Sequence, residues 1–135
     1  MPEMSPAEAH LSLGMRAVGA ALVFGLAPLL YVLRHGYLWE PNQYEYEWMI
    51  LVTYVSLGIA LYAGASDIRG ADMLLTWAIY GGFFSHATVM LVETFMDWRQ
   101  EWEHVMPYGD VTVLYASGAL LLVLKRRYDA EQKAQ

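Results

Sequence analysis

The sequence predicts an all-α integral membrane protein, an antiparallel up-down-up-down bundle of four transmembrane helices. Its composition is 57% hydrophobic and only 16% charged, with a mean hydropathy of +0.29, whereas soluble domains carry about 25% charged residues. The apolar residues gather in four blocks, Ala17–Leu33, Trp48–Ala65, Met73–Met96 and Val111–Leu124. Because the remaining residues are too few to cover a water-soluble core, we interpret residues 1–135 as a single transmembrane domain.

Each block is matched against the length that a bilayer requires. A hydrocarbon core of about 30 Å takes roughly 20 helical residues. We therefore expect helices over about 13–34, 47–66, 72–97 and 108–126. The fourth block has only 14 strictly apolar residues, so a shorter tilted or interfacial helix stays open there. Three spans with one re-entrant piece is the alternative count.

The distribution of Lys and Arg predicts the orientation of these spans. With four spans, the two termini and the short connection 66–72 share one side. That side carries six cations, Arg16, Arg69, Lys125, Arg126, Arg127 and Lys133, against Arg34 and Arg99 on the other. Since cytoplasmic segments retain Lys and Arg, we expect a multi-pass protein of the cell inner membrane with both termini cytoplasmic.

Composition and motifs also exclude several classes of function. A net charge of −6 without a basic stripe argues against nucleic-acid binding. The absence of cysteine excludes disulfides and thiolate metal sites. No nucleotide-binding, acyl-transfer or zinc-protease motif occurs. The sequence therefore indicates no catalytic residue and no identifiable cofactor, and it favours a protein that is not an enzyme.

Small residues recur at four-residue spacing within the predicted helices. They are Ala21 with Gly25, then Ser56, Ala60 and Gly64, then Ala78 with Gly82 and Gly81 with Ser85. In lipid, such faces allow helix backbones to approach closely. We expect Gly25, Gly64 and Gly82 to pack the helices of the monomer. A homo-oligomer or a larger membrane complex is the alternative.

His86 and Glu93 are the ionisable residues inside the third apolar block. Their separation of seven residues places them on one helix face. Ionisable groups at membrane depth are functional candidates, so this pair is a candidate ligand-binding site, and we expect His86 to face the bundle interior. The alternative is a neutral histidine bonded to a serine or a backbone carbonyl, with Glu93 at headgroup level.

Three further features lie near the ends of the predicted spans. Glu101-x-x-His104 matches one Glu-x-x-His element of di-iron bundles; because no second copy exists, we expect at most a surface cation site, or a solvated amphipathic extension. Asp110 is expected to be the N-cap of the fourth helix. Lys125-Arg126-Arg127 is typical of a stop-transfer cluster.

Short motifs resemble a known family. They are Tyr46-Glu47-Trp48-Met49-Ile50 with Tyr54, Leu57 and Gly58, then Ser85-His86-Ala87 with Val89-Met90, then Gly109-Asp110-Val111. Over roughly residues 15–125 the chain is similar to an uncharacterised family of small bacterial four-helix integral membrane proteins, a domain of unknown function. The resemblance implies the four-helix fold and no activity. The acidic segment Asp97–His104 departs from the family pattern, which weakens a ligand role there.

Two main functional hypotheses follow. The first is a non-enzymatic packing or accessory subunit in the lipid bilayer, with a membrane-protein partner or a second copy of the chain. The second is a ligand-binding or transport protein for a cation, proton, quinone or tetrapyrrole at His86 and Glu93. A membrane enzyme with a carboxylate and histidine site on the outer side ranks last.

Overall fold

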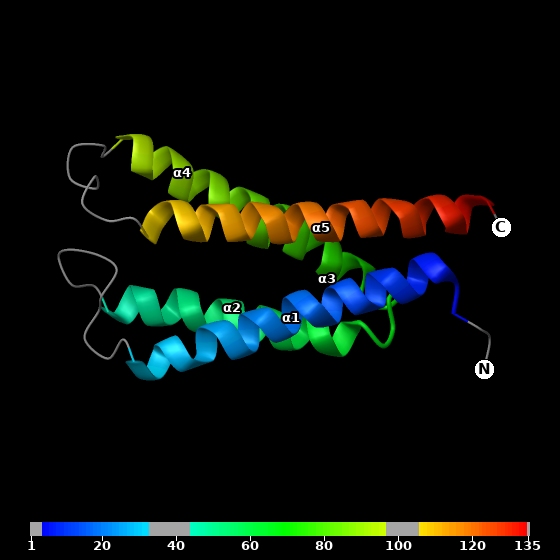
Figure 1. Ribbon diagram of the computed structural model, residues 1–135, viewed down its shortest axis with the longest axis horizontal. Helices are drawn as coiled ribbons and strands as arrows, with labels where there is room; N and C mark the ends of the chain where they lie inside the picture. Colours follow the sequence, from blue (N-terminus) through cyan, green and yellow to red (C-terminus); the bar gives the residue numbers. More distant parts are fainter. Residues whose placement is uncertain (1–3, 33–43, 97–105, 135) are drawn as a thin grey trace. The chain divides into compact units, whose positions relative to one another are not determined.

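The computed structural model describes residues 4–32, 44–96 and 106–134, and within these ranges every regular element is a helix (Figure 1). The elements are α1 (Pro6–Val32), α2 (Tyr44–Gly64), α3 (Asp72–Trp77), the π-helix η1 (Ala78–Ser85), α4 (His86–Met96) and α5 (Met106–Ala134). Because α3, η1 and α4 follow one another without a break, they make one helix over 72–96. The described residues therefore contain four helices and no strand, which confirms the predicted all-α class.

Both terminal helices extend beyond the expected boundaries. The first begins at Pro6 rather than near residue 13, because Ser5 caps it: the Glu8 N–H donates to Ser5 Oγ at 3.2 Å, and proline suits the first helical position. The last helix runs to Ala134 rather than ending near residue 126. Its final residues include Lys, Arg, Ala, Glu and Gln, which are strong helix formers in water.

The chain divides into two compact units, Met1–Ala71 and Asp72–Gln135. In the first unit, α1 and α2 form an antiparallel hairpin, since Ser12 contacts Ala65 while Gly19 meets Gly58. Buried apolar side chains line this hairpin, among them Val18, Leu22, Leu51, Leu57 and Leu61.

The second unit is a hairpin between the helix 72–96 and α5. Asp72 pairs with Lys125, and Thr88 bonds to Tyr115, so the two helices also run antiparallel. Between these contacts, the buried Phe83 lies against Gly118: a Cβ added to Gly118 would lie 3.0 Å from Phe83 Cβ. Because Gly118 has no side chain, the helix over residues 72–96 can approach α5 closely.

Two of the described helical segments are long and apolar enough to cross a membrane. They are Pro6–Leu26 and Asp72–Val92, each of 21 residues, and Trp48–Gly64 is a shorter apolar helix. Only 39% and 28% of the apolar windows in the two long segments are buried. Large apolar side chains therefore remain exposed, including Phe24, Ile59, Met73 and Val113.

Candidate functional site

Of the four predicted ligand residues, the structure describes His86 and the backbone of Glu93. His86 is half-buried at the first position of α4, and its backbone N–H bonds to the Phe83 carbonyl. Glu93 lies on the same helix, as predicted, although only its backbone is described. Glu101 and His104 lie outside the described residues. Within the described ranges, no group of three or more His, Cys, Asp or Glu side chains is arranged to hold a metal ion.

His86 directly follows the π-helix η1. The spacing of residues in the sequence does not predict this π-helix. η1 covers Ala78–Ser85 and includes the pair Gly81-Gly82. The Ser85 hydroxyl donates to the Tyr80 carbonyl, five residues earlier, at 2.7 Å, so the side chain supports the wide turn. Because each π turn contains more residues than an α turn, η1 changes the direction in which α4 presents His86 and the residues after it. Gly82 therefore belongs to this irregular segment.

The backbones of α1 and α2 approach each other closely at Gly19 and Gly58. A Cβ added to Gly19 would lie 2.5 Å from the Gly58 carbonyl oxygen and 2.9 Å from the Tyr62 nitrogen. A Cβ on Gly58 would lie 2.7 Å from the Gly19 carbonyl oxygen and 2.8 Å from Leu22 Cβ. Real Cβ atoms do not occupy such positions, so the backbones of α1 and α2 meet where neither helix has a side chain.

The glycines singled out by the sequence pattern lie elsewhere. Gly25 is exposed, and a Cβ there would meet nothing within 4 Å. Gly64 is the last residue of α2, where its carbonyl accepts a hydrogen bond from the Asp67 N–H at 3.0 Å. The small-residue spacing missed Gly19 and Gly58 because larger residues lie four positions away from each. The sequence signal for Gly19 and Gly58 was their place in a helix interior. Glycine weakens a helix there, so its presence often has a packing reason.

A buried serine joins the two ends of the first hairpin. Ser12 is the buried polar residue of the described core, and its hydroxyl donates to the Ala65 carbonyl at 2.7 Å. Ala65 follows the last residue of α2, where carbonyl groups have no partner within the helix. The Ser12 hydroxyl therefore satisfies a backbone acceptor across 53 residues of sequence.

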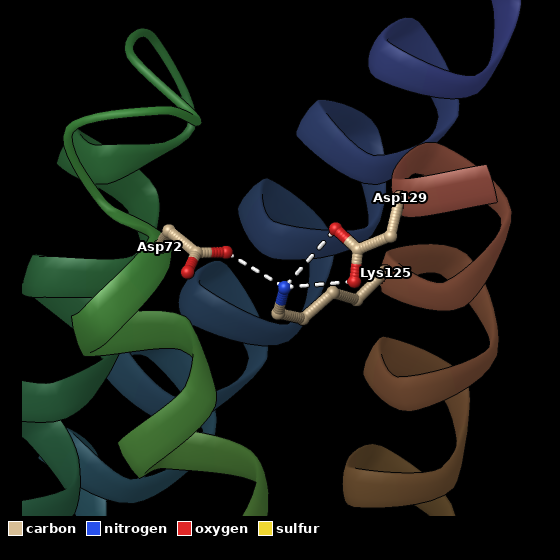
Figure 2. A network of polar contacts seen from close by, with 3 residues as sticks. All are labelled: Asp72, Lys125 and Asp129. Carbon is tan, nitrogen blue, oxygen red and sulfur yellow. Dashed lines mark hydrogen bonds and ion pairs between the residues drawn. The ribbon is translucent and has the colours of Figure 1, made fainter. Parts of the chain in front are cut away.

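An ionic cluster joins the two helices of the second unit, as Figure 2 shows. Lys125 Nζ lies 2.7 Å from Asp72 Oδ1 and 3.0 Å from Asp129 Oδ2. The Lys125 side chain is only 14% exposed, against 55% for Asp72 and 40% for Asp129. Burial by itself lowers the pKa of Lys125, but the hydrogen bonds and charges of Asp72 and Asp129 outweigh it and raise that pKa above its ordinary value. We call these three residues the Lys125 clamp.

One prediction for this unit needs correction. Asp110 lies inside α5 rather than at its N-cap, because the helix already begins at Met106. The stop-transfer role predicted for Lys125, Arg126 and Arg127 stays a prediction, and the charge of Lys125 is engaged by two carboxylates within the unit.

A second polar contact joins α4 to α5. The hydroxyls of Thr88 and Tyr115 lie 2.8 Å apart, and the Thr88 hydroxyl also lies 2.8 Å from the Phe84 carbonyl. The rings of Phe84 and Tyr115 are 6.0 Å apart between centroids, a separation typical of aromatic pairs. These contacts and the Lys125 clamp join the two helices of the second hairpin at two separate points.

A protein-family comparison covers almost all of these elements. The family model described as a family of unknown function, DUF6632, matches residues 6–134, from the first residue of α1 to the last residue of α5. The chain belongs to the DUF6632 family. Membership of DUF6632 confirms the predicted resemblance to a family of unknown function. No curated protein and no solved structure matches the chain.

Proposed function

We propose that this DUF6632 protein is a multi-pass integral membrane protein that acts by helix packing, as a non-enzymatic accessory subunit of the inner membrane. The observation that carries the proposal is the exposure of its apolar helices. In the two candidate spans, 39% and 28% of the apolar window is buried, whereas the central helix of a soluble protein is largely enclosed. Lipid is the environment that makes such surfaces stable.

The Gly19–Gly58 crossing supports the same proposal. Helices in lipid gain little from the hydrophobic effect, so they associate through close backbone packing and hydrogen bonds between helices. The first unit offers the glycine crossing and the Ser12–Ala65 bond, and the second offers the Thr88–Tyr115 bond. Packing of this kind holds the helices of each unit together and needs no reacting group.

Alkaline extraction tests the membrane assignment. Membranes from cells that produce the full chain are washed with sodium carbonate at high pH and then with a mild detergent. We expect the protein to resist carbonate and to enter the detergent. Release by carbonate would contradict membrane insertion. A protein that co-purifies in stoichiometric amount from the detergent extract supports the accessory role, and a purified chain that carries a catalytic activity would contradict it.

A ligand-binding or transport function at His86 and Glu93 is the second candidate. The observation that favours it is the π-helix immediately before His86, because π segments occur frequently at functional sites. A cation, proton, quinone or tetrapyrrole is the class of ligand that this pair would serve. The purified protein is examined by absorption spectroscopy and metal analysis, with His86→Gln as the comparison. A chromophore or metal that His86→Gln loses supports this candidate, and a colourless, metal-free protein argues against tetrapyrrole or metal binding.

A further inference from the structure

The three consecutive cations of α5 have different surroundings. Lys125 is enclosed by Asp72 and Asp129 in the Lys125 clamp. Arg126 and Arg127 are exposed, and the described part of the chain gives neither side chain an ion pair or a hydrogen bond. Among the described residues, acidic partners neutralise the charge of Lys125 but not the charges of Arg126 and Arg127.

The position of the two arginines is well defined along the helix. They lie two and three residues after the last residue of the apolar run Val111–Leu124. Because α5 continues without interruption to Ala134, the arginine backbones are held in regular helix rather than in a flexible tail. Lys125 and the buried Tyr128 lie three residues apart and mark the covered face of the helix. Arg126 and Arg127 fall between them on the exposed side.

We infer that Arg126 and Arg127 bind the phosphate headgroups of anionic phospholipids. The inference rests on the proposed membrane insertion, which puts the end of the apolar run at headgroup level. A guanidinium group offers a planar fork of donors that matches two phosphate oxygens, and juxtamembrane cations attract anionic lipids. The whole chain carries a net charge of −6, so it does not attract anionic lipid as a body. Enrichment of such lipid therefore requires a local cationic site.

The test compares lipids that remain bound to the full chain. Wild-type protein, Arg126→Gln/Arg127→Gln and Lys133→Gln are reconstituted with equal amounts of phosphatidylglycerol and phosphatidylcholine, and retained lipids are counted by native mass spectrometry. We expect wild type to retain phosphatidylglycerol in preference to phosphatidylcholine. In the double variant, the ratio of retained phosphatidylglycerol to phosphatidylcholine should fall about tenfold. Lys133→Gln removes an exposed cation farther along the same helix and should change the preference less than about twofold.

Three outcomes decide the inference. An unchanged lipid preference in a folded, carbonate-resistant double variant would overturn it while leaving the membrane proposal intact. An equal loss in Lys133→Gln would show that only net charge matters, and would also overturn it. If excess inorganic phosphate displaces phosphatidylglycerol from wild type, the site takes free phosphate rather than lipid. Carbonate extraction of wild type is measured separately, so its failure identifies a fault in the proposed function.

Discussion

Gly19 and Gly58 allow the backbones of α1 and α2 to touch, and they do so because neither glycine has a side chain. Each glycine lies in a helix interior, where it costs about 1 kcal/mol relative to alanine. The loss of intrinsic helix stability is offset by packing that no larger residue permits. These two positions should therefore respond to substitution differently from other helical glycines in the same unit.

Gly19→Ala should destabilise the first unit by about 1–3 kcal/mol, the range found for overpacking. Its new Cβ would lie 2.5 Å from the Gly58 carbonyl oxygen, so the helices must separate. Gly25→Ala is the matched control, because a Cβ there meets nothing within 4 Å. The control should be neutral or more stable by up to about 1 kcal/mol. Denaturant unfolding in detergent micelles, followed by circular dichroism, measures both variants, and equal stability of Gly19→Ala and wild type would refute the crossing.

Lys125 is the second residue with a defined energetic role. Its pKa is raised in the folded protein, whereas an unfolded chain gives lysine a pKa of about 10.4. Folding therefore favours the charged form, so the stabilisation is fully present below about pH 10 and is lost as the pH rises through the folded pKa.

The Lys125 clamp predicts a stability loss on the alkaline side. The free energy of unfolding of wild type should fall above about pH 10 by more than that of Lys125→Gln, because the variant has no charge to lose. At neutral pH, Lys125→Gln should be less stable by about 1 kcal/mol, a value near the upper limit for exposed ion pairs. All other side chains are the same in both proteins, so the difference between the two pH profiles is the measured quantity. Parallel profiles would show that the clamp does not contribute.

A few polar contacts join the helices of each unit. In the first unit, a buried serine makes such a contact. Ser12 binds the carbonyl of Ala65 just beyond the end of α2. Ser66 makes a hydrogen bond of the same type and length, to the Ala63 carbonyl at 2.7 Å, but it is exposed and local. Ser12 thus makes a bond across the α1–α2 hairpin, whereas Ser66 makes a bond within one turn.

Ser12→Ala should destabilise the α1–α2 hairpin by about 1–3 kcal/mol, since it leaves the Ala65 carbonyl without the hydroxyl that now satisfies it. Ser66→Ala should change stability by less than about 0.5 kcal/mol, as expected for an exposed position. Hydrogen exchange at the end of α2 and denaturant unfolding together give the comparison. Similar effects of the two substitutions would contradict a special role for Ser12.

The sequence is informative about helices and much less informative about how they meet. Apolar blocks predict four helices because each block approaches the length of a span. They do not predict that α5 reaches Ala134, since its polar end is built from strong helix formers rather than from an apolar block. No local pattern links Asp72 to Lys125 or Gly19 to Gly58, because such pairs depend on the register of two helices. The π-helix was missed because a π turn differs from an α turn by about one residue.

The same limit applies to the candidate ligand residues, whose role stays a prediction. His86 and Glu93 share one helix, which follows from spacing alone. The wide turn before His86 depends on a hydroxyl bonded five residues back, and spacing does not specify that bond. Ser12 contacts Ala65, and Lys125 contacts Asp72. The two residues of each pair are widely separated in sequence.

For the whole molecule, we propose four membrane spans with both termini in the cytoplasm. The proposal rests on the apolar blocks and on six Lys and Arg residues on one side against two on the other. Because the chain contains no cysteine, any introduced cysteine is the single labelling site. Gln43 and Gln100 lie in the two connections predicted to be outside, and Ser66 and Gln135 lie on the predicted inner side.

Labelling of these four single-cysteine variants with a membrane-impermeant maleimide, in spheroplasts and again after lysis, is the most direct test. We expect Gln43→Cys and Gln100→Cys to react in intact spheroplasts, whereas Ser66→Cys and Gln135→Cys should react only after lysis. Reaction of Gln135→Cys in intact spheroplasts would contradict the orientation. Reaction of only one of Gln43→Cys and Gln100→Cys would contradict the four spans.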